Sequence, residues 1–440
     1  MDDPAFEIEI DTNTQEILLH ASNHDLAALK PFLRIPGNAS VQDPETGSTP
    51  LHAAIAACGQ ARNIDTIGEA HTNGNGEKAE AEQNEDEGVE EADVENTKAV
   101  VKELFLSGAI WNDLDTNNET PGCLAWRLGH KELYEFCVEA GMRAEMLLGL
   151  MGKYETLESG SEEEEVVEEE EIEGRMGVQK DNAADTEGEP EPEAENLEGK
   201  AEERRDVNSA DYLASTLTFA DDRLLDSDNN GVMMAWETDI MTRSVASLLP
   251  PPSNTGKRIL NIGFGMGIID TMFATTKPSI HHIIEAHPSV LAKLKEPDHS
   301  FGSNWENSAP ETGAYKIHIG KWQDILPTLL ETGCVYDAIY FDTFGEDYSQ
   351  LKDFFTEFVP GLLDSEGRFG FFNGLGADRR VCYDVYTRVV ECDLNEAAME
   401  VEWELVKVDE LGEEGEGEWE GVRRRYWTLD EYRLPTCRFL

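Results

Sequence analysis

The sequence predicts an α/β fold over its second half, because short apolar strand candidates alternate there with segments long enough for helices. This alternation is typical of a parallel sheet with helices on both faces. Two further observations support the fold class: a glycine-rich loop directly follows the first strand candidate, and an acidic residue ends the next one. The strand candidates are residues 259–262, 280–285, 315–319, 336–342 and 368–373.

The glycine-rich loop contains Gly263, Gly265 and Gly267 and opens a helix candidate at 268–274. Glycine allows a tight turn and lets a ligand approach the backbone closely. The first N–H groups of the helix would face a polar or anionic group above them. Glu285 ends the next strand candidate, 22 positions after Gly263. A carboxylate at that place can accept hydrogen bonds from both ribose hydroxyls of an adenosine cofactor.

Two other interpretations of this loop stay open. NAD-dependent enzymes carry a G-x-G-x-x-G loop in the same position, but the sixth position here is Ile268. The close packing of helix on strand that the third glycine permits is therefore lost, and a dinucleotide is the weaker interpretation. An ordinary turn between a core strand and a helix would also look similar, although it does not explain Glu285.

Charge is distributed very unevenly along the 440 residues, which suffice for two or three domains and carry a formal net charge of −56. Much of it lies in glutamate-rich stretches at 162–165, 168–171 and 187–203 and in an acidic insert at 77–95. These stretches have few apolar residues to bury, so we expect disordered, solvated spacers. A polyanion can attract a basic partner, whereas the lack of a sizeable basic block argues against direct nucleic-acid binding.

The seven cysteines are an odd number without paired C-x-x-C spacing, which indicates reduced thiols rather than a disulfide or metal scaffold. The first residues, MDDPAFEIEI, lack the basic and apolar regions of a signal peptide, and no apolar run approaches the length of a membrane span. We therefore expect an intracellular protein of the cytoplasm and nucleus that makes no membrane contact.

The N-terminal region contains two Thr-Pro helix starts. The segment TPLHAA at 49–54 resembles the T-P-L-H-x-A signature of ankyrin repeats and follows a helix candidate at 25–33. A degenerate second copy begins at Thr120, 71 residues after Thr49, and residues 100–106 would supply the displaced second helix. The alternative is a plain helix start with proline in the first turn.

These features divide the chain into three parts. We expect an ankyrin-repeat-like domain at 15–150 with an acidic insert at about 67–97, an acidic disordered linker at 151–207, and a catalytic domain at 208–440. In the last part, residues 209–217 and 232–249 read as helices ahead of the glycine loop. Strand candidates at 401–408 and 423–429 would form an antiparallel hairpin at the sheet edge.

Five segments of the catalytic part, taken in order, resemble guanidinoacetate methyltransferase. Together with the ankyrin-like repeats in front, they are similar to the fungal protein arginine N5-methyltransferases, which methylate the internal δ nitrogen of arginine. The five segments are VMMAWETDIM (232–241), ILNIGFGMGI (259–268), IIEAHPSVLAKL (283–294), GKWQDILPTL (320–329) and YDAIYFDTF (336–344).

The resemblance implies a class I methyltransferase fold with a Rossmann-like, seven-stranded sheet and S-adenosylmethionine as cofactor. It places the glycine loop under the methionine part of the cofactor, Glu285 at the ribose hydroxyls, and Ala286 and His287 beside the adenine. Gln323 stands where guanidinoacetate methyltransferase has an acid, and its amide can still contact adenine. The implied cofactor residues are Tyr212, Met233, Met241, Gly263, Phe264, Gly265, Met266, Gly267, Ile268, Glu285, Ala286, His287, Trp322, Gln323 and Asp342.

Glu237 and Asp342 match the guanidine-binding carboxylates of this family and are the implied catalytic residues. The chemistry requires such groups, because a guanidinium and a sulfonium ~4 Å apart repel each other by about 4 kcal/mol at an effective dielectric constant near 20. Carboxylates cancel that repulsion and fix the planar guanidinium fork. One of them must also localise charge on the terminal nitrogens or accept a proton. His281, His282 and His287 suggest no metal site, because adjacent strand residues point to opposite faces.

The resemblance further implies a protein substrate that presents arginine, of the ribosomal protein class, and we expect a monomer. Two alternatives stay open. The first is a small-molecule guanidine methyltransferase of the guanidinoacetate type, which would not need the long N-terminal region. The second is a non-catalytic ankyrin adaptor, against which the complete set of glycines and acids argues.

Overall fold

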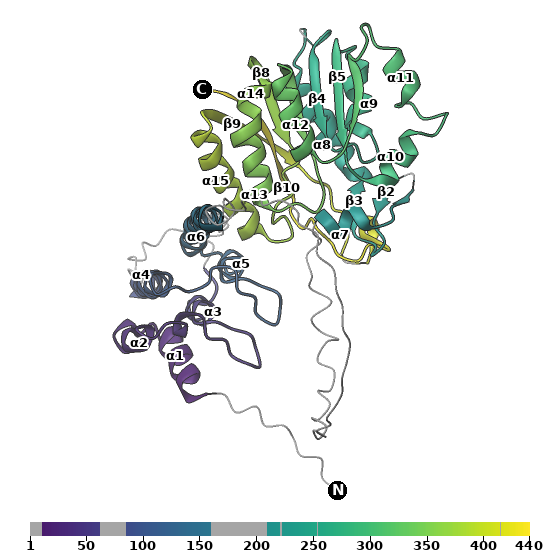
Figure 1. Cartoon of the computed structure of the whole chain (residues 1–440). Coiled ribbons are helices and arrows are strands. Elements are labelled where there is room, and N and C mark those ends of the chain that lie inside the picture. The colour runs from purple at the N-terminus through teal and green to yellow at the C-terminus, as the bar shows by residue number, and fades with distance from the viewer. Residues whose placement is uncertain (1–10, 62–84, 160–208, 221, 253, 414) are drawn as a thin grey trace, which may run out of the picture.

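The computed structural model describes residues 11–61, 85–159, 209–220, 222–252, 254–413 and 415–440. Helices of the N-terminal region lie on one side of an α/β domain (Figure 1). Most of the expected linker and most of the expected acidic insert fall outside the described residues. The expected boundaries need two corrections: a helix extends past residue 150 to Ser159, and another begins at Glu85, inside the expected insert.

The N-terminal region consists of short helices and two longer ones. Thr49 and Thr120 cap the two helices that begin with proline, because each hydroxyl accepts a backbone N–H of the first turn. The Nε2 atom of His52 lies 3.0 Å from the carbonyl oxygen of Glu119, so the first Thr-Pro turn is tied to the second. The helices are α1 (Thr12–Ser22), α2 (Leu26–Leu33), α3 (Pro50–Ala56), α4 (Glu85–Leu106), α5 (Pro121–Arg127) and α6 (Lys131–Ser159).

A seven-stranded sheet organises the catalytic part, as expected, in the order β6-β5-β4-β7-β8-β10-β9. The first five strands of that order pair in parallel, and β10 pairs antiparallel with both β8 and β9. The strands are β4 (Arg258–Ile262), β5 (Ile280–Glu285), β6 (Tyr315–Ile319), β7 (Tyr336–Phe341), β8 (Leu363–Phe371), β9 (Met399–Lys407) and β10 (Glu431–Phe439).

Both faces of this sheet are buried, because neighbouring strand residues point into different cores. Ile259 belongs to the core beneath α8 and α9, whereas Leu260 belongs to the core on the opposite face, beneath α12. The helices are α7 (Ser209–Ala214), α8 (Thr238–Leu248), α9 (Ile268–Thr275), α10 (Pro288–Leu294), α11 (Ser303–Asn307), α12 (Trp322–Glu331), α13 (Tyr348–Asp353), α14 (Val359–Leu362) and α15 (Arg380–Glu396).

Two expected elements of the catalytic part are wrong. The helix expected at 232–249 is split, because its first residues form β3 (Gly231–Met234) in a small antiparallel sheet with β1 (Thr218–Phe219) and β2 (Arg223–Leu225). The strand expected at 423–429 is a loop in which Trp427 is buried and Tyr426 partly buried, and β10 supplies the hairpin partner of β9 instead. In both cases the apolar and aromatic residues indicate a segment packed against the protein, but they do not indicate how its backbone pairs.

The N-terminal helices share one hydrophobic core with α15 of the catalytic part. Val381 and Val385 of α15 are fully buried in the same cluster as residues of α1 to α6. The helices approach closely because α6 has glycine at the contact: a Cβ on Gly141 would lie 2.6 Å from a methyl group of Val385. The two parts are therefore one packed unit rather than two domains joined only by a linker.

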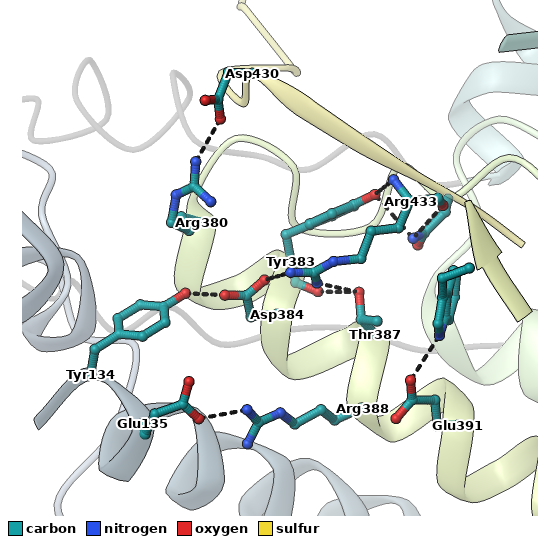
Figure 2. Close-up of polar contacts among 12 residues, drawn as sticks. Tyr134, Glu135, Arg380, Tyr383, Asp384, Thr387, Arg388, Glu391, Asp430 and Arg433 are labelled. Carbon is teal, nitrogen blue, oxygen red and sulfur yellow. Dashed lines mark hydrogen bonds and ion pairs between the residues drawn. The ribbon is translucent and has the colours of Figure 1, made fainter. Parts of the chain in front are cut away.

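Polar contacts extend this interface across α15 to β10 (Figure 2). The hydroxyl of Tyr134 on α6 donates to the carboxylate of Asp384, whose other oxygen lies 2.5 Å from a guanidinium nitrogen of Arg433 on β10. At the rim, Arg388 pairs with Glu135 at 2.5 Å. The orientation of α6 on the catalytic part is thus fixed by buried apolar and polar contacts together.

Val385→Asp is expected to destabilise the full chain by about 3 kcal/mol or more, because it puts an unpaired charge into this shared core. Urea denaturation followed by far-UV circular dichroism measures the change. The control is Arg388→Gln, one turn further along α15, which removes only a half-exposed ion pair worth at most about 1 kcal/mol. Equal stability of the two variants would contradict the shared core.

Candidate active site

Two adjoining cavities open at the carboxyl ends of β4, β5 and β7, which is where open α/β sheets bind ligands. The first has a volume of about 630 Å³ including its open mouth, and contains the glycine loop and Glu285 in its wall. The second, of about 870 Å³, is lined by Glu237, Tyr426 and the loop after β8. The residues common to both walls are Val232, Asp342, Thr343, Phe344 and Glu346. Molecules in the two cavities would therefore meet at Asp342.

The glycine loop needs glycine at two places for different reasons. Gly263 has φ +91°, and a Cβ there would lie 1.8 Å from the carbonyl oxygen of Asp342. Gly265 has φ +55°, and its Cβ would lie 2.6 Å from the terminal methyl group of Met233. Gly263 is thus closed to other residues by conformation and by space, whereas Gly265 is restricted chiefly by its positive φ, because the end of the flexible Met233 side chain can move. The absence of side chains keeps the floor of the first cavity open.

Glu285 is almost completely buried at the end of β5, with 7% of its surface exposed. Its carboxylate accepts the backbone N–H groups of Phe264 at 3.0 Å and His287 at 2.6 Å. Burial raises the pKa of Glu285, and the backbone N–H donors oppose that shift. One acidic side chain thus joins the glycine loop to the loop after β5 and presents acceptor oxygens in the wall of the first cavity.

The far wall of the first cavity is held by Glu346. This carboxylate accepts the indole N–H of Trp322 at 3.0 Å and the hydroxyl of Thr343 at 2.7 Å. The side-chain amide of Gln323 donates to Gln350 at 2.8 Å, and its buried carbonyl oxygen has no hydrogen-bond partner among the described residues. Such an orphaned acceptor in a cavity wall fits an N–H donor of a ligand, as on the exocyclic amine of adenine.

Two carboxylates face the second cavity. Glu237 ends the short helix after β3 and is 4% exposed, and the hydroxyl of Tyr426 donates to it. Burial raises the pKa of Glu237 to about 8, the Asp342 carboxylate adds to this, and the Tyr426 hydroxyl opposes it. Burial raises the pKa of Asp342 to about 7. The cavity therefore favours a bound cation, which would keep both groups charged.

The structure brings together most of the residues that the sequence suggested for a cofactor. The following nine line the first cavity: Tyr212, Met233, Gly263, Gly265, Glu285, Ala286, Trp322, Gln323 and Asp342.

The other suggested cofactor residues are not part of the lining of the first cavity. The side chains of Met241 and Phe264 are buried in the core between α8, α9 and the sheet. His287 is fully buried and caps α10, and its Nε2 atom lies 2.9 Å from the carbonyl oxygen of Tyr212. Met266, Gly267 and Ile268 are likewise outside the lining of the first cavity, where they continue the loop into α9.

Sequence reasoning missed Glu346 and Tyr426. Glu346 could have been found, because it lies four residues after Asp342 in the loop that follows a central strand, at the edge where ligands bind. Tyr426 gave no local signal, since it lies 189 residues from its partner Glu237 in the chain.

The described residues contain neither a metal-binding cluster nor a membrane-spanning helix. No group of three or more His, Cys, Asp or Glu side chains there is arranged to hold a metal ion. His281 and His282 instead bond Asp270 and the hydroxyl of Tyr336, at 2.8 and 2.7 Å. None of the helices in the described ranges is both long and apolar enough to cross a bilayer.

The chain is similar to named proteins over nearly its whole length. Residues 205–376 match the family described as guanidinoacetate N-methyltransferase. The chain is 56% identical to protein arginine N-methyltransferase 2 of Gibberella zeae, over 94% of this chain and 90% of that one. It is 53% identical to the protein of the same name from Neurospora crassa, over 97% of this chain and 95% of that one.

Similarity to solved structures is weaker. The O-methyltransferase TomG from Streptomyces achromogenes, solved in complex with SAM, has a TM-score of 0.31 and 15% identity, over 47% of this chain and 81% of that one. The sequence relatives are decisive, and they confirm a methyltransferase with S-adenosylmethionine as its cofactor. Identity above one half over nearly the full length shows that this chain belongs to the protein arginine N-methyltransferase 2 family.

Proposed function

We propose that this enzyme methylates the δ nitrogen of arginine residues in target proteins. The observation that carries the proposal is a pair of carboxylates in the wall of the second cavity, the buried Glu237 and the partly buried Asp342, of which Asp342 also lines the first cavity. A match to the guanidinoacetate N-methyltransferase family supports a guanidine group as the acceptor. The names of the full-length relatives support arginine as its carrier.

The polar groups in the wall of the first cavity fit S-adenosylmethionine. Glu285 offers acceptor oxygens for the ribose hydroxyls, and the free carbonyl oxygen of Gln323 offers an acceptor for the adenine amine. The open floor at Gly263 and Gly265 leaves room for the methionine part beside Asp342. When bound, the cofactor supplies a methyl group on a sulfonium centre, and the electron pair of the broken S–C bond stays on sulfur.

Glu237 and Asp342 would perform two tasks on the guanidinium. Their negative charges offset its repulsion from the sulfonium, which is about 4 kcal/mol at ~4 Å and an effective dielectric constant near 20. Hydrogen bonds from the terminal nitrogens to carboxylate oxygens would draw the positive charge away from the δ nitrogen. The δ nitrogen then has electron density for the new N–C bond and is held in line with the methyl group.

The reaction also releases one proton, because arginine enters and methylarginine leaves with a single positive charge each. The proton comes from the δ nitrogen as the N–C bond forms, and a carboxylate of raised pKa can accept it. Glu237 is the better acceptor of the two, since burial raises its pKa to about 8 in the absence of a bound cation. We therefore assign proton acceptance to Glu237 and charge compensation at the junction of the cavities to Asp342.

The N-terminal helices fit a role in presenting a protein substrate. We propose that the two Thr-Pro helix units are ankyrin-like repeats, supported by their matching caps at Thr49 and Thr120. The δ specificity, a ribosomal protein as substrate, a monomeric enzyme and residence in cytoplasm and nucleus are parts of the same proposal. They rest on the resemblance and on the charge of the chain, which suits a basic protein partner.

A small-molecule guanidine methyltransferase is the second candidate, favoured by the match of residues 205–376. Parallel assays with guanidinoacetate and with a basic arginine-containing protein separate the two. The proposal expects methyl transfer to the protein at least about 100-fold faster at equal concentration, because only a protein can use the helical part for binding. Preference for guanidinoacetate would contradict it.

A further inference from the structure

The second cavity contains a tyrosine that the proposed mechanism does not yet use. Tyr426 comes from the loop between β9 and β10, and its hydroxyl donates to an oxygen of Glu237. The indole N–H of Trp236 lies 3.2 Å from the same hydroxyl oxygen. Because an indole can only donate, the phenol oxygen accepts that hydrogen bond, and its own proton is free to be directed at Glu237.

The ring of Tyr426 is fixed on several sides. The rings of Trp419 and Trp236 have their centroids 4.9 and 6.1 Å away. Gly231 of β3 lies against the same ring, since a Cβ there would be 3.0 Å from a ring carbon. The phenol is therefore preorganised for one acceptor before any substrate arrives, and it cannot turn away without displacing this aromatic cluster.

We infer that Tyr426 is a positioning residue, which holds the Glu237 carboxylate in the charge state and orientation that a guanidinium acceptor requires. This inference rests on the proposed function. The phenol holds one oxygen of Glu237, the backbone of Met234 gives the carboxylate a second hydrogen bond, and both Glu237 and Tyr426 line the second cavity. The Tyr426 hydrogen bond favours the charged carboxylate, against burial and against the negative charge of Asp342.

Loss of the Tyr426 hydroxyl should therefore change the pH dependence of kcat/KM. The other ionisable groups near Glu237 are Asp342, Tyr340 and Tyr432, and the pKa of each tyrosine is raised well above its usual value, so both stay neutral. Of these groups near Glu237, only the Glu237 and Asp342 carboxylates titrate between pH 6 and 9, and both must be charged to bind a guanidinium. The acidic limb of kcat/KM reports this pair as a coupled unit.

The test compares pH profiles of kcat/KM for the wild-type enzyme and Tyr426→Phe, with a basic arginine-containing protein as substrate. The expected result is a shift of the acidic limb to higher pH by about one unit and a loss of about 10-fold at pH 7, the size of one hydrogen bond to a charged group. The Kd for S-adenosylmethionine should stay within about 2-fold, since Tyr426 does not line the first cavity.

Tyr336→Phe is the matched control. It removes another buried hydroxyl, bonded to His282 at 2.7 Å at the opposite end of β7, and a purely structural loss there leaves the pH profile in place. Trp236→Phe removes the donor to Tyr426 and keeps a smaller aromatic ring beside it, so it should give a smaller shift in the same direction. This variant takes the place of Tyr426→Phe in the test if Tyr426→Phe does not fold. An unshifted profile in an active enzyme overturns the inference, whereas a wild-type enzyme inactive on arginine proteins overturns the proposed function instead.

Discussion

Glu237→Gln is expected to lower kcat by a factor on the order of 10³ or more, while the Kd for S-adenosylmethionine stays within about 2-fold. The amide keeps the size and can still accept the Tyr426 hydrogen bond, but it can neither offset the guanidinium charge nor accept its proton. Single-turnover kinetics and calorimetric cofactor titration measure the two effects separately. Cofactor binding persists because Glu237 lines only the second cavity.

The control for this variant is Asp239→Asn, two residues further along the chain. Asp239 is exposed and pairs with Arg243 at 2.8 Å on the surface of α8, so its loss should leave turnover unchanged. Turnover of Glu237→Gln near the wild-type rate would remove Glu237 from the mechanism. Equal losses in both variants would point to a disturbance of α8 rather than to chemistry.

Stability offers an independent readout of the same carboxylate. The folded pKa of Glu237, about 8, lies above its ordinary value of 4.5, so the folded state holds the proton more tightly than the unfolded chain. The stabilising contribution of this group is full below pH 4.5 and is lost as pH rises through 8. Without ligands, the thermal stability of Glu237→Gln relative to wild type should therefore increase as pH rises from about 4.5 to about 8.

Glu285→Ala is expected to weaken S-adenosylmethionine binding by about 100-fold or more, the loss expected when two hydrogen bonds to a charged acceptor disappear. The loss has a second source, because the N–H groups of Phe264 and His287 lose their acceptor and the glycine loop loses its tie to β5. Isothermal titration calorimetry measures this directly. The exposed Glu296, two residues after the end of α10, supplies the control: Glu296→Gln should bind the cofactor normally.

A Kd for Glu285→Ala close to that of wild type, in a variant with unchanged circular dichroism, would contradict the assignment of the first cavity to the cofactor. Tighter binding of NAD than of S-adenosylmethionine by the wild-type enzyme would contradict it more broadly. The two measurements use the same titration and need no methyl acceptor, so they do not depend on the identity of the protein substrate.

The parallel strands were predictable because their residues carry an unambiguous local pattern. β5 and β6 begin and end where the sequence indicated, since each is a short apolar or alternating run bounded by turn residues. The loop at 423–429 was not predictable, because aromatic residues that pack against the protein suit a strand and a loop equally well. β10 was missed because it contains Pro435 and Arg433, which weaken the pattern of a central strand.

Site residues could be predicted where they lie at the end of a strand that the sequence itself indicates. The glycine loop, Glu285 and Asp342 all follow strands that end at one edge of the sheet, so topology alone brings them together. The contacts of Tyr426 with Glu237 and of α15 with α6 join residues 189 or more positions apart, and no local pattern encodes them. Such contacts depend on packing of the complete chain.

The position of the transferred methyl group tests the central claim most directly. The enzyme is incubated with isotope-labelled S-adenosylmethionine and a basic arginine-containing protein, and tandem mass spectrometry of the modified peptide locates the label. The claim predicts label on the δ nitrogen, which stays with the side-chain fragment when the terminal guanidine nitrogens are lost. Label that leaves with a terminal nitrogen would contradict it.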